Sequence, residues 1–345
     1  MLKRISLGQK LMLMLCLILI LVFGLVNFLT LKTIHTQNRQ QANTIASLNS
    51  KYNAENIEKN FEQIITIGNA LSIEMESMIA NNHASRNLVI DTMKGLLAKN
   101  KNLFGITVTY EPNAFDNNDG KHLGAPGSDA SGQFMPYVTR KGNDFAIELS
   151  TYPYYDTKQM DWYNIPKTTQ KIYLTEPITY LVQGKDVAMA SVVVPILRNN
   201  RFVGVVSIDT SLEYLQTEAE KINLMGGFVE IVSEKGTYVA NGHDASTILT
   251  PVKMESDWQS TVKELFENKN FLSKGYSFEY YDEYLVVINP IKISDTGQYW
   301  YYMSNIPLEN IYSQYNHLFQ VLLIVSLIFL CFIIYINYAI ITRNL

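Results

Sequence analysis

The chain has 345 residues, enough for two or three domains, and a formal net charge of −4 at pH 7. It contains no block of basic residues, which argues against nucleic acid as a partner. The hydrophobic content of 47% is ordinary, but the apolar residues are concentrated in two long runs, 11–31 and 318–341.

Each apolar run is long enough to cross a hydrocarbon core of about 30 Å as a helix that rises about 1.5 Å per residue. The alternatives are a signal peptide for the first run and a buried core helix for the second. The apolar region of a signal peptide is only about 7–15 residues long, which is shorter than the first run. We therefore predict an uncleaved transmembrane helix at 11–31 and another at 318–341.

Basic residues flank both runs on the terminal side, three before the first run and Arg343 after the second. This bias predicts that the terminal segments 1–10 and 342–345 are cytoplasmic. The region between the spans would then lie outside a bacterial inner membrane. Both cysteines, Cys16 and Cys331, fall inside the spans, so we expect the exported region to be stable without a disulfide.

Residues 32–100 are predicted to be helical. The part from 36 to 79 has no proline and carries apolar residues at helical spacing: Ile57, Phe61, Ile64, Leu71, Met75 and Met78. This stripe either packs inside the chain or forms the seam of a homodimer, and the sequence leaves both open. Ser85 is a good N-cap for a second helix over 86–100.

From residue 104 the apolar period changes to two, which predicts strands over 104–110, 134–140 and 144–149. The loop 111–133 between the first two strands has an acidic cluster. Its spacing does not fit an EF-hand, because Phe115 stands at the first ligand position counted back from Gly120 and no Glu closes the loop. We interpret the acidic residues as turn formers and predict no metal ion and no cofactor.

The segment 159–209 begins with Trp162 and Tyr163 at the start of a short helix. Strand-like runs follow over 172–181, 187–197 and 202–209. The last run is apolar and β-branched and ends at Asp209, so the carboxylate either caps the next segment or faces a pocket. Residues 101–211 are predicted to form one sheet module.

Residues 212–306 are predicted to form a second, smaller sheet module. Its expected elements are a helix at 212–222, strands at 228–233 and 237–240, a helix at 258–267, and strands at 275–280, 283–288 and 299–306. The fold class is therefore α+β, with a long N-terminal helix and two antiparallel-sheet modules in tandem between two transmembrane helices.

Five stretches carry a family resemblance: EPNAFD, GSDASGQFMPYVTR, DWYNIPK, EPITYLVQGKDVAMASVVVPI and RFVGVVSID. They resemble the double-Cache (tandem PAS-like) extracytoplasmic sensor region of bacterial methyl-accepting chemotaxis receptors, and the resemblance covers essentially the whole chain. It implies that the first module is membrane-distal and holds a small-molecule site. It also implies that the second module is membrane-proximal and that the signal passes through the second span.

Many members of this family bind free amino acids. An Arg two residues before a Trp-Tyr pair grips the carboxylate, while a Tyr and two Asp hold the amine. Three positions match: Trp162, Tyr163 and Asp209. Met160 stands where the Arg would be, and Ile178 and Tyr180 stand where the Tyr and the first Asp would be. The resemblance therefore implies that the amine-reading half of the site is retained.

The chemistry of the residues also indicates a ligand that carries an amine. Trp162 and Tyr163, with Tyr137, Tyr173 and Tyr180, could line one cavity around the Asp209 carboxylate. Each aromatic face attracts a cation by about 0.5–2 kcal/mol, and a charged hydrogen bond contributes about 1.5–3 kcal/mol. The alternative is that these residues are core aromatics and a helix cap.

The ligand class depends on Met160. A buried ligand carboxylate needs a guanidinium partner, which methionine cannot supply, although Arg140 is a candidate. We predict a ligand that carries an amine and lacks an α-carboxylate, and we expect Met160→Arg to shift the preference towards amino acids.

No HExxH, GxSxG or phosphate-binding loop is present, and the five histidines are scattered, so we do not expect an enzyme. The predicted function is a transmembrane chemoreceptor-type sensor. The alternatives are an amino-acid-sensing input region of a histidine kinase or diguanylate cyclase, and a structural membrane protein without a ligand. Since residue 345 follows the second span closely, we expect output through a further C-terminal region or a partner membrane protein.

Overall fold

The computed structural model describes residues 7–81, 83–150, 160–252, 258–267, 271, 275–280 and 283–343. The chain divides into two compact units. The first consists of Met1–Ala46, Glu279–Leu285 and Ile306–Leu345, and the second of Ser47–Phe278 and Val286–Asn305.

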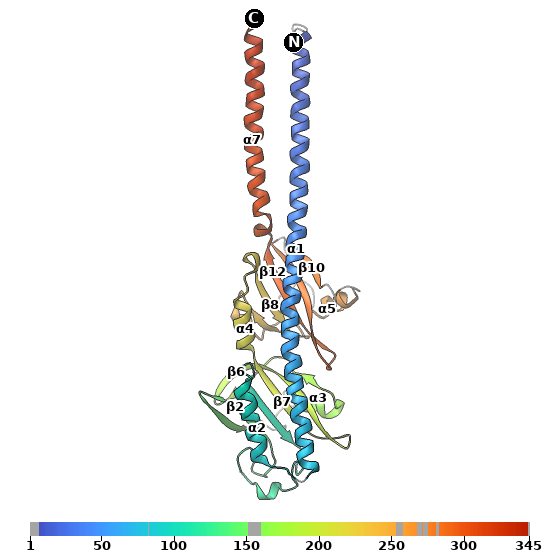
Figure 1. Ribbon diagram of the computed structural model, residues 1–345, viewed down its shortest axis with the longest axis vertical. Coiled ribbons are helices and arrows are strands. Elements are labelled where there is room, and N and C mark those ends of the chain that lie inside the picture. The colour runs from blue at the N-terminus through green and yellow to red at the C-terminus, as the bar shows by residue number, and fades with distance from the viewer. Residues whose placement is uncertain are drawn as a thin grey trace. The chain divides into compact units, whose positions relative to one another are not determined.

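The two apolar runs lie on two long helices, α1 (Leu7–Ala80) and α7 (Leu308–Arg343) (Figure 1). Each contains a stretch long and apolar enough to cross a membrane. The helix expected at 36–79 is confirmed, but it is continuous with the first apolar run because no residue between them breaks the helix.

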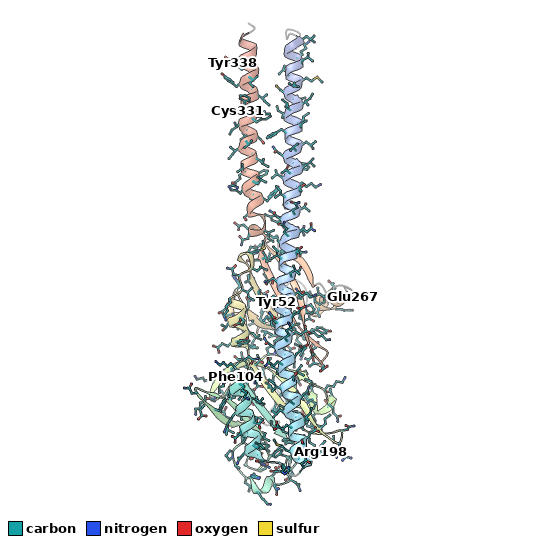
Figure 2. All side chains as sticks on the ribbon, in the orientation of Figure 1. Tyr52, Phe104, Arg198, Glu267, Cys331 and Tyr338 are labelled. Atoms are coloured by element: carbon teal, nitrogen blue, oxygen red, sulfur yellow. The ribbon has the colours of Figure 1, made fainter. Side chains whose placement is uncertain are left out.

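The helices of the first unit contact each other through a few specific pairs. The Asn27 amide donates a hydrogen bond to the Ser326 hydroxyl at 3.2 Å, and the ring centroids of Phe23 and Phe329 are 5.0 Å apart. Most of the remaining apolar side chains project outward; Figure 2 shows Tyr338, which is 66% exposed, on the outer side of α7. Such an exposed apolar surface is typical of a helix in contact with lipid.

The second unit contains a seven-stranded antiparallel sheet with the order β3-β2-β1-β7-β6-β4, in which β5 also pairs with β6. Its strands are β1 (Gly105–Tyr110), β2 (Pro136–Lys141), β3 (Asp144–Leu149), β4 (Tyr173–Leu174), β5 (Ile178–Val182), β6 (Lys185–Arg198) and β7 (Arg201–Ser211). Strand β1 and the central part of strand β7 are buried and contribute to the core. The predicted strands are found within one to two residues of their expected ends, with one exception.

The exception is the run 172–181, which forms two strands instead of one. The register passes from Leu174 opposite Val192 to Ile178 opposite Met189. Between these pairs, three residues on this side therefore lie opposite two on β6, which is a bulge. Pro177 lies in the gap, and a proline has no N–H with which to continue the ladder.

The apolar stripe of α1 packs inside the chain. Phe61, Ile64, Leu71 and Met75 are at most 3% exposed and belong to one core that includes strands of both sheets, while Ile57 and Met78 pack against it. This resolves the alternative left open by the sequence in favour of intramolecular packing. A homodimer stays a prediction, and it would have to use a different surface.

Helix α2 (Arg86–Lys99) begins where it was expected, with the Ser85 hydroxyl accepting a hydrogen bond from the Leu88 N–H. Its first residue, Arg86, is buried and pairs with Asp116 and Asp119 of the loop 111–133 at 2.8 and 2.7 Å. Asp116 does form a turn, since its Oδ1 accepts a hydrogen bond from the Asn118 N–H at 3.0 Å, but the sequence interpretation missed the second role of these two acids. They neutralise a buried guanidinium that holds the loop onto α2.

The second sheet is five-stranded, with the order β10-β11-β12-β8-β9. Its elements are α4 (Leu212–Glu220), β8 (Phe228–Val232), β9 (Tyr238–Asn241), α5 (Trp258–Glu267), β10 (Tyr276–Tyr280), β11 (Tyr284–Ile293) and β12 (Gln298–Pro307). The described residues also include three short 3₁₀ helices, Asp119–Lys121, Leu224–Gly226 and Ala245–Thr247. β12 pairs with β8 and is followed directly by α7.

Candidate functional site: a cavity on the first sheet

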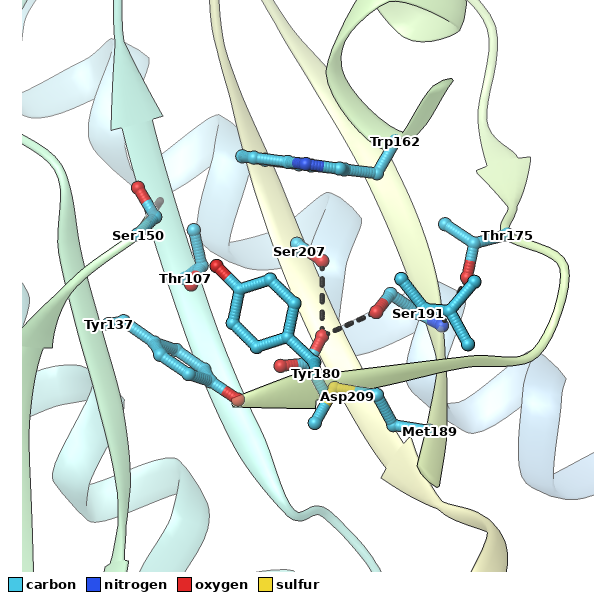
Figure 3. A pocket seen from close by; sticks show the side chains of 11 residues that line it. Thr107, Tyr137, Ser150, Trp162, Thr175, Tyr180, Met189, Ser191, Ser207 and Asp209 are labelled. Carbon is cyan, nitrogen blue, oxygen red and sulfur yellow. Dashed lines mark hydrogen bonds between the residues drawn. The ribbon is translucent and has the colours of Figure 1, made fainter. Parts of the chain in front are cut away.

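A cavity lies on one face of the first sheet (Figure 3). The space between its walls, part of which is open to solvent, is about 430 Å³. This volume suits a small ligand rather than a peptide. The lining residues are Thr107, Tyr137, Ser150, Trp162, Thr175, Ile178, Tyr180, Met189, Ser191, Ser207 and Asp209.

The Asp209 carboxylate lies at the base of the cavity. Asp209 is only 5% exposed, and it stands in register with Gly105 of β1 and Ser191 of β6, so these three residues form one cross-strand row. Its Oδ1 atom accepts hydrogen bonds from the Ser191 hydroxyl at 2.7 Å and the Ser207 hydroxyl at 3.3 Å. Burial raises the pKa of Asp209 above its ordinary value, and the hydrogen bond from Ser191 acts in the opposite direction.

Tyr137 provides a hydroxyl beside this carboxylate. Its ring packs over β1, where a Cβ atom on Gly105 would come within 2.7 Å of it, so the glycine leaves the space that the ring needs. Burial and the Asp209 charge raise the pKa of Tyr137, which keeps the phenol protonated. The hydroxyl is close enough to Asp209 to interact with its carboxylate and lower the Asp209 pKa, but the geometry is not that of a well-formed hydrogen bond.

Aromatic rings enclose the rest of the cavity. The rings of Tyr137 and Tyr180 meet edge to face with centroids 6.3 Å apart. Figure 3 shows the Trp162 indole across the cavity from Asp209. A group bound between Asp209 and Trp162 would have a carboxylate on one side and a π face on the other, which is an arrangement that favours a cation.

The helix α3 (Asp161–Thr169) carries Trp162 to the cavity, while its neighbour Tyr163 faces the other way. The Tyr163 hydroxyl donates to Glu111 Oε1 at 2.5 Å, and Lys167 Nζ donates to the same atom at 2.6 Å. Tyr163 is buried against Val193 and other apolar residues. It does not line the cavity, so its place in the structure is that of an anchor for α3.

Three further predicted site residues do not line the cavity. Arg140 donates hydrogen bonds to the carbonyl oxygens of Leu97, Asn100 and Leu103 at the end of α2. Met160 is 5% exposed and packs in the apolar cluster of Tyr163. An arginine at position 160 would enter this cluster, so the expectation that Met160→Arg changes the ligand preference has no support in the geometry.

Tyr173 is the third of these residues. It pairs with Val193 at the edge of the sheet. Burial, with smaller contributions from Asp161, Glu176 and Glu234, raises the pKa of Tyr173 to about 12. Of the eight predicted site residues, the structure therefore brings four together in the cavity: Trp162, Tyr180, Tyr137 and Asp209.

The cavity also contains hydroxyl groups that the sequence interpretation missed. Thr107 and Ser207 face each other in register, and Ser207 and Asp209 are two residues apart on one strand and hence on one face. Thr175 accepts a hydrogen bond from the Ser191 N–H at 2.9 Å. For Ser207 a signal was available, because Ser207 and Asp209 are polar residues spaced by two in an otherwise apolar strand.

Comparison with known proteins places this cavity within a recognised domain. Residues 89–217 match the family model described as methyl-accepting chemotaxis protein-like, first PDC sensor domain, and all the residues that line the cavity fall inside this range. The chain contains a Cache-type sensor region.

A curated relative is the methyl-accepting chemotaxis protein TlpQ of Pseudomonas aeruginosa, 28% identical over 167 residues. The match covers 44% of this chain and 23% of TlpQ, so the chain spans about a quarter of that relative. The extracellular domain of the putative histidine kinase mmHK1S-Z3 is 25% identical with a TM-score of 0.67, and the match covers 82% of this chain and 98% of that domain. The extracellular domain of the putative histidine kinase mmHK1S-Z2 is 26% identical with a TM-score of 0.64, and the match covers 80% of this chain and 99% of that domain.

The Cache-type sensor region lies between two helices that can cross a membrane. Together with the likeness to extracellular sensor domains, this makes the chain a membrane protein with an extracellular sensor. The cytoplasmic position of both termini stays a prediction.

Proposed function

We propose that this Cache-type sensor region binds a small amine that lacks an α-carboxylate, with the ammonium group at Asp209 and the carbon skeleton against Trp162. One observation carries the proposal. Among the described residues that line the cavity, Asp209 is the only one whose side chain is normally charged at neutral pH. A cationic group would therefore be neutralised on binding.

The same observation disfavours a ligand carboxylate. Removing a carboxylate from water costs several kcal/mol unless a cation or several donors replace its hydration. No lysine, arginine or histidine is among the described residues that line the cavity, and the Arg140 guanidinium is occupied by three backbone carbonyls. A bound amino acid would thus place its carboxylate near Asp209 without a compensating charge.

The attractive contributions suit micromolar affinity. A charged hydrogen bond to Asp209 contributes about 1.5–3 kcal/mol, and each aromatic face that the cation contacts adds about 0.5–2 kcal/mol. The Tyr137 hydroxyl offers a further acceptor that the free chain does not use. The cost of immobilising the ligand reduces the total.

Calorimetry on the full chain in lipid nanodiscs tests the proposal with matched pairs. Isoamylamine and leucine share a side chain, as do phenethylamine and phenylalanine, and each pair differs only in the α-carboxylate. We expect at least one amine to bind roughly 100-fold more tightly than its amino acid, which corresponds to about 2.7 kcal/mol. Tighter binding of the amino acids would overturn the proposal, and isoamyl alcohol controls for apolar binding alone.

For the output we propose a chemoreceptor, since the family model and TlpQ both belong to chemotaxis proteins. A histidine kinase is the second candidate, because the extracellular domains of two putative kinases cover most of this chain. An amine-dependent swimming response in the source cells, lost on Asp209→Asn, supports the first. Amine-dependent autophosphorylation of the receptor without a swimming response supports the second.

A further inference from the structure

Three consecutive residues, Leu174, Thr175 and Glu176, connect the cavity to the second sheet. The Thr175 side chain lines the cavity. The residues on either side of it both bind the second sheet: Leu174 through its backbone, and Glu176 through its carboxylate, which accepts a hydrogen bond from the Ser233 hydroxyl at 2.6 Å. Ser233 directly follows β8.

The contact at Leu174 is a two-bond pairing with Gln298. The Leu174 N–H donates to Gln298 Oε1 at 2.8 Å, and Gln298 Nε2 donates to the Leu174 carbonyl oxygen at 2.9 Å. β4 is the edge strand of the first sheet, and an edge strand normally leaves one row of backbone groups without partners. Here a side-chain amide occupies the position that a neighbouring strand would take.

Gln298 is the first residue of β12, and β12 ends at Pro307, where α7 begins. β12 also pairs with β8, opposite Val232 at Tyr301. The segment Leu174–Glu176 is thus bound to the start of β12, the strand that leads into α7. It is also bound to Ser233 at the end of β8, the strand that pairs with β12.

Hydrogen bonds link this segment to the carboxylate in the cavity. The Ser191 hydroxyl donates to Asp209 at 2.7 Å. The Ser191 N–H donates to the Thr175 hydroxyl, and the Ser191 carbonyl oxygen accepts from the Thr175 N–H, both at 2.9 Å. Asp209 and Thr175 are therefore linked through a single residue, Ser191.

We propose that Gln298 couples the cavity to the second sheet, and that its pairing with Leu174 transmits a change at Asp209 to β12. The inference rests on the proposed function in taking the cavity as the signal input. Spatial continuity alone does not demonstrate coupling, whereas a double-mutant cycle does.

The test needs no ligand, so it is independent of whether an amine binds. Asp209→Asn removes the charge in the cavity while keeping the shape of the side chain. Hydrogen exchange, read by mass spectrometry on the full chain in nanodiscs, follows peptides of β8 and β12 in four proteins: wild type, Asp209→Asn, Gln298→Ala and the double variant. The matched control is Gln170→Ala, because Gln170 is an exposed glutamine that bonds Asn200 on the first sheet.

We expect Asp209→Asn to change exchange in β12 by about fivefold, the lower end of typical coupling. The change should disappear in the Gln298→Ala background and persist in the Gln170→Ala background. If it persists with Gln298→Ala, or if Asp209→Asn leaves β12 unchanged, the proposal is wrong. Should Gln298→Ala not fold, Gln298→Met keeps the side-chain volume and removes both hydrogen bonds to Leu174, together with the longer one from Gln298 Nε2 to Glu234 at 3.4 Å.

Discussion

Among the described residues, each of the two sheets has one buried carboxylate, and the two differ in what surrounds them. Asp209 of the first sheet accepts hydrogen bonds from two serine hydroxyls and faces a cavity lined by aromatic rings. Glu230 of the second sheet accepts from the amides of Asn305 at 2.9 Å and Asn241 at 3.3 Å, one on each oxygen. Burial raises the pKa of both carboxyls.

The difference shows that burial and a shifted pKa do not by themselves make a binding site. Glu230 has a side-chain donor at each oxygen and ties three strands of its own sheet together. At Asp209 the space beside the carboxylate is enclosed by Trp162 and Tyr180, and the Tyr137 hydroxyl has no well-formed hydrogen bond. The space beside the carboxylate distinguishes a place for a ligand from a structural carboxylate.

The largest expected effect comes from removing each charge in turn. Asp209→Asn should weaken isoamylamine binding roughly 10- to 150-fold, the value of one charged hydrogen bond. Glu230→Gln should leave the affinity within about twofold but destabilise the fold by about 1–3 kcal/mol, because the new NH₂ group faces an asparagine donor. Calorimetry and thermal unfolding of both variants measure this. A loss of binding in Glu230→Gln at a temperature where it is folded would break the distinction.

The raised pKa of Asp209 predicts a pH dependence. An ammonium group needs the ionised carboxylate, so the affinity should be constant above that pKa and fall about tenfold per pH unit below it. The fall should begin above the ordinary aspartate value of about 3.9. For the free chain the sign is opposite: a raised folded-state pKa means that this group's contribution to stability improves as pH falls through the folded pKa towards about 3.9. Calorimetry at a series of pH values measures the first trend, and the dependence should be absent in Asp209→Asn.

Trp162 provides the next test. Trp162→Ala removes the indole face opposite Asp209 and should weaken amine binding roughly 2- to 30-fold, the range of one cation–π contact. Tyr163→Phe is the matched control, since its hydroxyl binds Glu111 and its ring lies outside the cavity. Equal losses in the two variants would indicate that the whole helix α3, and not the indole, sets the affinity.

The smallest effect is expected from Tyr137→Phe. The hydroxyl has no well-formed hydrogen bond in the free chain, so its removal should leave the unfolding temperature unchanged or slightly higher, while binding weakens roughly 2- to 12-fold. Asn305→Ala makes the contrasting change in the second sheet, where Glu230 loses a donor and stability should fall by about 1–3 kcal/mol. A clear loss of stability in Tyr137→Phe would show that this hydroxyl has a structural partner.

Much of the fold could be predicted from the sequence because its patterns are local. The period-two runs and their turns give the strands, and the Ser85 cap gives the start of α2. The break at Pro177 was missed because the β-type residues on both sides suggested one strand. The ion pairs of Arg86 were missed because they join residues 30 and 33 positions apart.

The site was predicted only in part. Asp209 and Trp162 come from the family resemblance, and Tyr137 and Tyr180 from aromatic content. Arg140 could have been excluded: it is three positions from Tyr137 on the same strand, and residues an odd number apart point to opposite faces. Met160 and Tyr173 could not have been excluded, because no periodicity in the sequence indicates which way their side chains point.

A structure of the chain bound to isoamylamine tests the central claim most directly. The account predicts the ammonium nitrogen within hydrogen-bond distance of an Asp209 carboxylate oxygen, with the alkyl chain against the Trp162 indole. An amine found outside the cavity, or one bound inside with its nitrogen away from Asp209, would contradict it.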